Sequence, residues 1–401
     1  MTKEKFTRVP YGSTVHGQEE IDAVISVLKE STQMGARVNL FENKISQLFE
    51  KKYGLMTNSG SSALYLAIES LDLDDGAEVI TPALTFATTV ACLVKNNLTP
   101  SFVDVKEDTY CIDEMKIEKS ITKKTRAILA PDLLGNICRW DLIKSIADKH
   151  NLLVLHDSAD TLGATYKGKS PGVFTDLSIT SFYGSHIING AGNGGMLCSS
   201  DDSVIKKAKL LRSWGRSSSL FADSESIENR FQVYLDEIRY DAKFVFEEIG
   251  YQLEPSEISA AFGLIQLEKL AKNLELRRKF FDLHNQFFDN YSDFFILPKE
   301  TEDSHTGWLA YPLIVKENRK FTRTDLQIFL EKRNIQTRVV FTGNILRQPG
   351  FKNINCLGKA EDFVNSDKVM KGGMLLACHH GLNEESINHI HQSVKLFLEN
   401  N

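Results

Sequence analysis

Residues 181–196 have the sequence SFYGSHIINGAGNGGM, and the interpretation of the whole chain depends on this stretch. An apolar, strand-like run over 177–182 leads into it, and a second apolar run begins at Met196. Between the runs the chain turns at Gly184, presents one imidazole at His186 and passes through further glycines. Because glycine adopts positive φ and lets a ligand approach the backbone, the pattern suits a pocket wall. Taken by itself, the stretch could also be a glycine-rich connector with an incidental histidine. The choice between connector and pocket wall depends on the rest of the chain.

Size and charge limit the class of protein. The 401 residues are enough for two domains, and a hydrophobic share of 42% supports large buried cores. The net charge of −6 provides no basic excess to neutralise phosphates, so nucleic acid is not expected as a partner. The charged start Met1–Phe6 has no apolar segment behind it, and no apolar run could span a bilayer. We expect a soluble, cytoplasmic protein with no membrane partner.

The cysteines also favour a cytoplasmic protein. Six of them are scattered without any C-x-x-C pair, which is typical of reduced, mostly buried thiols and not of a disulfide framework or a zinc site. They are Cys92, Cys111, Cys138, Cys198, Cys356 and Cys378. No metal is therefore expected.

Short apolar runs alternate with helical patterns over the first two thirds of the chain. The expected strands include 78–81, 102–105, 127–130 and 152–155. Uninterrupted apolar strands between helices indicate a mostly parallel sheet covered on both faces, an α/β fold. Ligands of such sheets bind at the carboxyl ends of the strands. The candidates that fall there are Asn58, Phe86, His156, Asp157 and Ser181.

The sequence also predicts two domains. A large domain is expected over 1–272 and a smaller α+β domain over 273–401, with the alternative that the N-terminal helices pack with the smaller domain. Polar residues 217–236 lack a clear period and are expected to form a long functional loop. In the smaller domain the patterns predict strands over 307–315 and 336–341, and helices over 323–332 and 383–398.

A candidate anion site follows the short strand 55–57. The segment Asn58–Ser62 is rich in serine and glycine and opens a helix, so free N–H groups and the positive end of the helix dipole meet there. A phosphate would suit Gly60 and Ser61. The alternative is an ordinary serine N-cap, which the residues alone favour.

Pyridoxal phosphate would connect these features. With its phosphate at Gly60 and Ser61, the carboxylate of Asp157 would keep the pyridine nitrogen protonated, since opposite charges stabilise each other at close range. Phe86 would stack on the ring, and Ser181 would add a hydroxyl to the phosphate. Where most such enzymes have the lysine that binds the cofactor covalently, this chain has His186.

The chain resembles, over nearly its whole length, the sugar aminotransferase/dehydratase (DegT/DnrJ/EryC1/StrS) family of fold-type I pyridoxal phosphate proteins. Segments 58–63, 156–160 and 250–253 resemble its phosphate loop, pyridine-nitrogen strand end and partner-facing loop. Within the family, the likeness is greatest to nucleotide-sugar 3-dehydratases, which have histidine in place of the lysine. Four segments carry this likeness: 181–183, His186, 213–216 and 337–349.

The resemblance implies a reaction. Pyridoxamine phosphate would condense with the C4 ketone of a nucleotide-linked 4-keto-6-deoxyhexose. His186 would act as general base on the cofactor and as acid toward the departing C3 hydroxyl, a role worth about 10² to 10⁴ in rate. The products would be a 3-deoxy-4-keto sugar and ammonia, as in deoxysugar biosynthesis for lipopolysaccharide O-antigen. The chain would act as a homodimer with shared active sites.

Two departures from the family matter. Gln252 stands where the partner loop usually has asparagine, which leaves open its contact with the phosphate. One dehydratase branch carries an iron–sulfur cluster on closely spaced cysteines after the histidine, whereas here no cysteine occurs between Cys198 and Cys356. No cluster is therefore expected, and the resemblance favours the branch that regenerates its amine cofactor from a donor such as glutamate.

The remaining candidates have weaker support. Asp160 would lie near the cofactor 3-hydroxyl, or would only cap a turn. Arg338 and Arg347 suit sugar phosphates or the donor carboxylate, or surface pairing. Arg216 would serve the nucleotide or the partner subunit. Two other functions remain open: a nucleotide-sugar 4-aminotransferase that tolerates His186, and a catalytically silent regulator with this fold.

Overall fold

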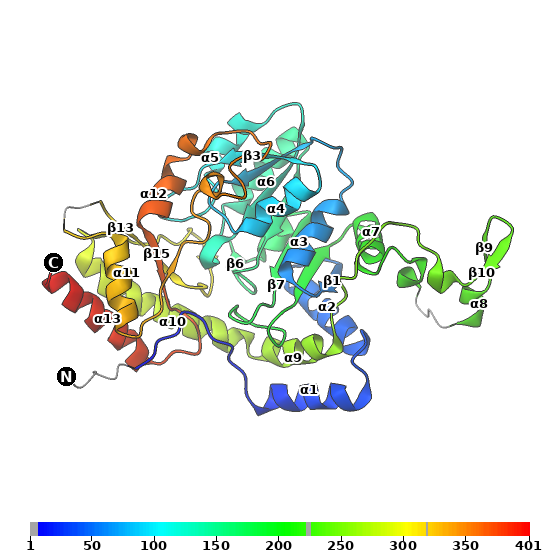
Figure 1. Cartoon of the computed structure of the whole chain (residues 1–401), viewed down its shortest axis with the longest axis horizontal. Coiled ribbons are helices and arrows are strands. Elements are labelled where there is room, and N and C mark those ends of the chain that lie inside the picture. Colours follow the sequence, from blue (N-terminus) through cyan, green and yellow to red (C-terminus); the bar gives the residue numbers. More distant parts are fainter. Residues whose placement is uncertain (1–6, 222–225, 318–319) are drawn as a thin grey trace.

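The computed structural model describes residues 7–221, 226–317 and 320–401, so the charged start over residues 1–6 lies outside it. A seven-stranded sheet forms the centre of the molecule (Figure 1). Its strands follow the order β1-β8-β7-β5-β4-β2-β3, and only β8 runs antiparallel to its neighbours. The predicted mostly parallel sheet is thus confirmed. The strands are β1 (Tyr53–Thr57), β2 (Glu78–Pro82), β3 (Thr99–Val103), β4 (Thr125–Pro131), β5 (Leu153–Asp157), β7 (Leu177–Ser181) and β8 (Gly195–Ser199).

Helices cover both faces of this sheet because its strands are apolar on both sides. Successive residues face opposite cores: Val79 packs with α3, α4 and α7, whereas Ile80 packs with α6. Val154 and Leu155 divide in the same way, with Val154 on the α6 side. The covering helices are α3 (Gly60–Glu69), α4 (Ala87–Lys95), α6 (Trp140–His150) and α7 (Asp202–Arg212), together with the short α5 (Glu114–Ile117).

The two N-terminal helices pack on the large sheet's side of the molecule. Helices α1 (Gln18–Glu30) and α2 (Ala36–Leu48) lie against α9 (Glu257–Glu268), away from the C-terminal sheet (Figure 1). The buried carboxylate of Glu257 accepts hydrogen bonds from the backbone N–H groups of Gly35 (2.6 Å) and Val38 (3.0 Å), at the start of α2. This side chain therefore caps a helix more than 200 residues away in sequence.

The long helix α10 (Leu270–Phe288) leads into the C-terminal part of the chain. Four strands there form an antiparallel sheet in the order β11-β13-β15-β14. The proposed domain boundary at 272/273 would fall in the first turn of α10 and remains a proposal. The elements are β11 (Phe295–Ile296), β13 (Tyr311–Val315), β14 (Arg338–Val339), β15 (Gly373–Leu376), α11 (Arg323–Lys332), α12 (Val364–Gly372) and α13 (Glu384–Glu399).

The strand expected over 336–341 is shorter than predicted. Only Arg338 and Val339 pair with β15, because the backbone turns at Phe341 (φ +41°) and Gly343 (φ +60°). A further two-stranded pairing joins β12 (Ser304–His305) to β6 (Thr165–Tyr166) and ties the C-terminal part to the large sheet domain.

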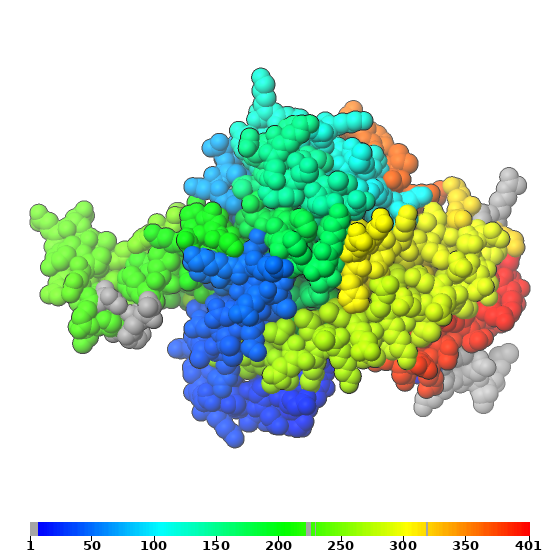
Figure 2. Space-filling view, turned by 180° about the vertical axis from the view of Figure 1, so that it is seen from behind, coloured from blue at the N-terminus to red at the C-terminus, as the bar shows by residue number. Residues whose placement is uncertain are grey.

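The later part of the stretch 217–236, expected to form a loop, belongs to a projecting arm that we define as residues 226–246. It contains α8 (Ile227–Arg230) and a hairpin of β9 (Val233–Leu235) and β10 (Ile238–Tyr240), and it stands away from the body of the molecule (Figures 1 and 2). Residues 222–225 of the expected loop lie outside the described part. Apolar side chains of the arm are exposed, among them Ile227, Tyr234, Ile238, Phe244 and Phe246.

In the part of the chain that the structure describes, no helix has the length and apolar character needed to cross a membrane.

Candidate active site

A cavity of about 530 Å³ opens at the carboxyl ends of the parallel strands. This is the place where such sheets bind ligands. Seven residues singled out from the sequence line this one cavity, although they come from positions far apart in the chain. They are Gly60, Ser61, Phe86, Asp157, Asp160, Ser181 and His186.

The N-terminus of α3 forms a compact polar cradle at one end of the cavity. Ser59 is its N-cap, and its hydroxyl accepts the backbone N–H of Ser62 at 3.1 Å. The N–H groups of Gly60 and Ser61 are in the first turn, where a helix leaves them without intrahelical partners. A Cβ at Gly60 would lie 2.6 Å from the Cβ of Ser181, so only glycine lets the end of β7 approach the helix this closely. The cradle suits an anion, since the helix dipole adds positive potential there.

Asp157 ends β5 and lies buried on the cavity wall. Its Oδ2 accepts the Thr89 hydroxyl at 3.0 Å, and its Oδ1 accepts the Ala159 N–H at 3.1 Å. Burial raises the pKa of Asp157, although both hydrogen bonds oppose this shift. Among the described residues the Asp157 carboxylate forms no ion pair, so a cation placed in the cavity would stabilise it.

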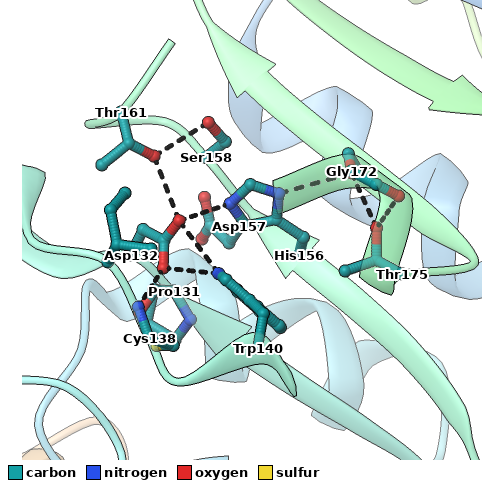
Figure 3. Close-up of polar contacts among 12 residues, drawn as sticks. Pro131, Asp132, Cys138, Trp140, His156, Asp157, Ser158, Thr161, Gly172 and Thr175 are labelled. Atoms are coloured by element: carbon teal, nitrogen blue, oxygen red, sulfur yellow. Dashed lines mark hydrogen bonds and ion pairs between the residues drawn. The ribbon is translucent and has the colours of Figure 1, made fainter. Parts of the chain in front are cut away.

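The residue before Asp157 points to the opposite side of the strand. Nε2 of His156 lies 2.7 Å from Oδ2 of Asp132, and the same carboxylate accepts the Cys138 N–H (2.8 Å) and the Trp140 indole N–H (3.0 Å) (Figure 3). These groups are all buried. The network holds the carboxyl end of β5 on the side opposite to Asp157. It therefore fixes the direction in which Asp157 faces the cavity.

Asp160 also lines the cavity and is buried. Its Oδ2 accepts the backbone N–H of Leu134 at 2.9 Å. Burial, followed by the negative charges of Asp157 and Asp132, raises the pKa of Asp160 to about 7. A carboxyl group with this pKa can exchange a proton near neutral pH.

His186 lies in the turn after β7, partly buried, and points into the cavity. Its Nδ1 is 3.3 Å from the carbonyl oxygen of Ser181, and its ring packs edge-on to Tyr183, with the ring centroids 5.9 Å apart. Burial and, to a smaller extent, the nearby charge of Arg277 lower the pKa of His186 to about 4, although the hydrogen bond to Ser181 opposes this shift. The imidazole is therefore neutral at physiological pH and able to accept a proton.

The turn around His186 has the backbone that its glycines predict. Gly192 (φ +107°) and Gly194 (φ +134°) lie in the left-handed region, and Gly194 lines the cavity. The glycine-rich stretch is thus a pocket wall, as the sequence indicated.

Four residues predicted to bind the cofactor or the substrate do not line the cavity, and neither do the strand-end candidates Asn58 and His156. Arg347 forms a bidentate ion pair with Asp367 (2.6 and 2.5 Å), which is the surface pairing left open above. Arg338 is exposed beside the cavity, with its guanidinium 5.3 Å from the ring centroid of Tyr11, a lining residue.

Gln252 and Arg216 lie further along the same surface. Gln252 is exposed, but its neighbour Leu253 accepts the backbone N–H of Asn58 at 3.0 Å, so this loop adjoins the cradle within one subunit. Arg216 stacks over Trp214 at 4.3 Å, and its buried Nε has no hydrogen-bond partner in the described residues.

Several residues of the site were not found from the sequence. Thr89 holds Asp157, and Tyr11 brings an N-terminal segment to the cavity. Phe341 lies edge-on to Phe86, with centroids 5.7 Å apart. Tyr11 belongs to no motif, whereas Phe341 lies in segment 337–349 and Thr89 lies in the first turn of α4, directly after Phe86.

The residues present fit pyridoxal phosphate. The cradle offers N–H groups for the phosphate, and Asp157 offers a buried carboxylate that lacks a cationic partner. Phe86 is 52% exposed into the cavity and could cover a ring. Among the described lining residues there is no lysine, and the imidazole of His186 takes that place.

Comparison with known proteins agrees with this fit. The sequence pattern of the DegT/DnrJ/EryC1/StrS aminotransferase family matches residues 15–395. The lipopolysaccharide biosynthesis protein RfbH of Salmonella typhimurium is 33% identical over 394 residues, which cover 95% of this chain and 90% of that protein. The dTDP-4-dehydro-2,6-dideoxy-D-glucose 3-dehydratase of Saccharopolyspora spinosa is 32% identical, with 97% of this chain and 86% of that protein covered.

A solved structure gives the same result for the fold. The Escherichia coli GDP-4-keto-6-deoxy-D-mannose 3-dehydratase with bound hydrated pyridoxal phosphate superposes with a TM-score of 0.87 at 27% identity. The match covers 97% of this chain and 100% of that structure.

Proposed function

This chain belongs to the DegT/DnrJ/EryC1/StrS aminotransferase family, whose members bind pyridoxal phosphate, and we propose that it is a 3-dehydratase of nucleotide sugars. Its substrate would be a nucleotide-linked 4-keto-6-deoxyhexose, and its product the 3-deoxy-4-keto sugar. One observation carries the proposal: the cavity presents the neutral imidazole of His186 and, among its described lining residues, no lysine.

The cofactor, in its pyridoxamine form, supplies the amino group that condenses with the C4 ketone and the electrons that expel the C3 hydroxyl. The chain supplies the remaining functions. Gly60 and Ser61 bind the phosphate through their N–H groups, and Phe86 covers one face of the ring. The carboxylate of Asp157 would keep the ring nitrogen protonated, because a buried carboxylate gains stability from an adjacent cation.

His186 moves the protons. A carbonyl oxygen can only accept a hydrogen bond, so the contact with Ser181 assigns the ring proton to Nδ1 and leaves the lone pair on Nε2. With the cofactor and sugar bound, Nε2 would be the atom of this chain that accepts the proton and later gives it to the leaving hydroxyl group of the sugar. Asp160, whose pKa is about 7, would share a proton with the cofactor 3-hydroxyl.

We also propose that glutamate regenerates the amine form of the cofactor. An iron–sulfur dehydratase needs closely spaced cysteines, whereas this sequence has none between Cys198 and Cys356. The chain would work as a homodimer in which the loop of Gln252 reaches the partner's site. The exposed apolar side chains of the arm support association.

Product analysis tests the proposed function. The protein is incubated with pyridoxal phosphate, glutamate and a panel of GDP-, CDP- and dTDP-4-keto-6-deoxyhexoses, and the sugars are followed by mass. A product that has lost one oxygen atom, with release of ammonia, is expected from one member of the panel. An amino sugar that keeps its C3 hydroxyl would instead identify a 4-aminotransferase. A protein that binds no cofactor would be a silent regulator.

A further inference from the structure

Arg277 is fully buried on α10, and within the described residues it forms no ion pair. A buried cation without a carboxylate partner is costly unless hydrogen bonds satisfy it, so its surroundings need an explanation. Burial lowers the pKa of Arg277 to about 10, a value at which the guanidinium still carries its charge at neutral pH.

The guanidinium donates hydrogen bonds to main-chain carbonyls of two segments that are far apart in the sequence. Its two terminal nitrogens donate to the carbonyls of Leu309 (2.9 Å) and Trp308 (3.1 Å) before β13, and to those of Ser185 and His186 (3.3 Å each). Its Nε donates to Nδ1 of His380 at 3.2 Å. The fork therefore ties the turn that carries His186 to the C-terminal part of the chain.

A second residue of α10 continues this contact. Asn273 lies one helical turn before Arg277, on the same face, and its amide donates to the carbonyl of Ile187 at 3.0 Å. Three successive carbonyls, at positions 185, 186 and 187, are thus held by one helix face. Asn273 is also buried, so water does not compete for these carbonyls.

We infer that Arg277 is a positioning residue for His186: it holds the peptide groups on either side of the imidazole so that the ring projects into the cavity in its neutral form. The inference rests on the proposed function in one respect, namely that His186 carries out the proton transfers. The geometric part concerns this chain alone. The titratable groups that share the cavity with His186 are Tyr11, Asp132, Asp157, Asp160 and Tyr183.

Two substitutions separate charge from geometry. Arg277→Gln removes the positive charge and most donors, whereas Arg277→Lys keeps the charge but replaces the planar fork by a single ammonium. Arg278→Lys is the matched control, because the neighbouring Arg278 faces outward and pairs with Glu300 and Asp282. The control is expected to behave as the wild type in every measurement.

The first readout is the titration of His186 in the protein without cofactor or substrate, followed by histidine 13C NMR, with the signal assigned by loss in His186→Asn. In Arg277→Gln we expect the His186 pKa to rise by about one unit, since the repelling charge is gone. In Arg277→Lys it should stay at the wild-type value. If Arg277 served only to stabilise the fold, the His186 pKa would not differ between Arg277→Gln and Arg277→Lys in this way.

The second readout is turnover. A displaced imidazole should lower kcat by about 10- to 100-fold in both variants, with little change in KM. A folded Arg277→Gln with wild-type titration and kcat would overturn the inference. If that variant does not fold, a wild-type kcat in Arg277→Lys would overturn it equally. If the wild type turns over no substrate, the proposed function fails while the titration still tests Arg277.

Discussion

The imidazole Nδ1 of His186 lies 3.3 Å from the main-chain oxygen of Ser181, five residues earlier in the chain. This contact fixes the tautomer and directs Nε2 into the cavity. We therefore expect His186→Asn to lower kcat by about 10² to 10⁴. Its affinity for pyridoxal phosphate should stay within a few-fold of the wild type. Steady-state kinetics and cofactor titration check this, and an Asn variant with wild-type turnover would remove His186 from the mechanism.

The absence of a lysine from the described cavity lining predicts how the cofactor is held. Borohydride should not fix pyridoxal phosphate covalently to the wild-type protein, because an imidazole forms no stable Schiff base with an aldehyde. His186→Lys places an amine in the same turn and should become labelled. Intact-protein mass spectrometry after reduction measures both. A labelled lysine in the wild type would show that the site is misplaced.

The close approach of α3 to β7 predicts the effect of a single methyl group. In Gly60→Ala the new Cβ would lie 2.6 Å from the Cβ of Ser181, so helix and strand must separate. We expect a loss of stability of about 1 to 3 kcal/mol and weaker cofactor binding. Gly350→Ala is the control, since its Cβ would meet no atom within 4 Å. Urea unfolding and cofactor titration compare the two, and equal effects would argue against the cradle.

Asp157 should contribute to cofactor affinity through its charge. In Asp157→Asn the hydrogen bonds from Thr89 and Ala159 can largely remain, but the charge is lost. A hydrogen-bonded ionic contact in a buried site is worth about 1.5 to 3 kcal/mol, so we expect cofactor affinity to fall about 10- to 100-fold. The exposed Asp148→Asn on α6 serves as the control. Unchanged affinity in Asp157→Asn would exclude the proposed contact with the ring nitrogen.

His284 predicts how stability depends on pH. It is fully buried, with Nδ1 3.0 Å from Nε2 of His391, and burial lowers its pKa to about 3. Because the folded pKa lies below the unfolded value, the stability that this group contributes is complete above about pH 6.5 and is lost as the pH falls toward 3.

Between pH 7 and pH 5, His284 should account for a loss of about 2 kcal/mol. In His284→Gln, where an amide can keep both contacts, the difference in unfolding free energy between these pH values should shrink by that amount. Urea unfolding at both pH values measures it. An identical pH dependence in the two proteins would mean that His284 is not buried in its neutral form.

The proposed dimer predicts complementation between inactive chains. Gln252 would serve the partner's cavity and His186 its own, so a mixture of Gln252→Ala and His186→Asn chains can assemble one intact site. Activity should appear on mixing two inactive proteins and should be absent from each alone. Sedimentation measures the association, and an active monomer would contradict shared sites.

The parts of the site that the sequence predicted share one physical rule. Parallel strands end at one edge, so Asp157 and Ser181 could be placed together without knowing any contact between them. The α3 cradle followed in the same way from its position after β1. In each case the signal was local, since an apolar run was followed directly by a polar or small residue.

The residues that were missed depend on long-range packing. Tyr11 reaches the cavity because Val9 pairs beside Ile335, a contact that no local pattern indicates. Arg277 lies just after the expected domain boundary at 272/273, and only the packed structure shows that it faces inward. Arg347 has the chemistry of an anion ligand, yet Asp367 neutralises it. The local sequence shows the chemistry of such side chains, but it does not predict which way they point in the folded protein.

The pairing of β1 with β8 sets an order of events for the newly made chain. Tyr53 lies opposite Ser199, so this edge of the sheet can close only after synthesis has passed Ser199, and contacts between residues so far apart in sequence form slowly. The cradle and Ser181 meet only once this edge has formed. Vitamin B6 can therefore stabilise only a chain that is already nearly native, and during refolding its capture should be among the last steps to finish.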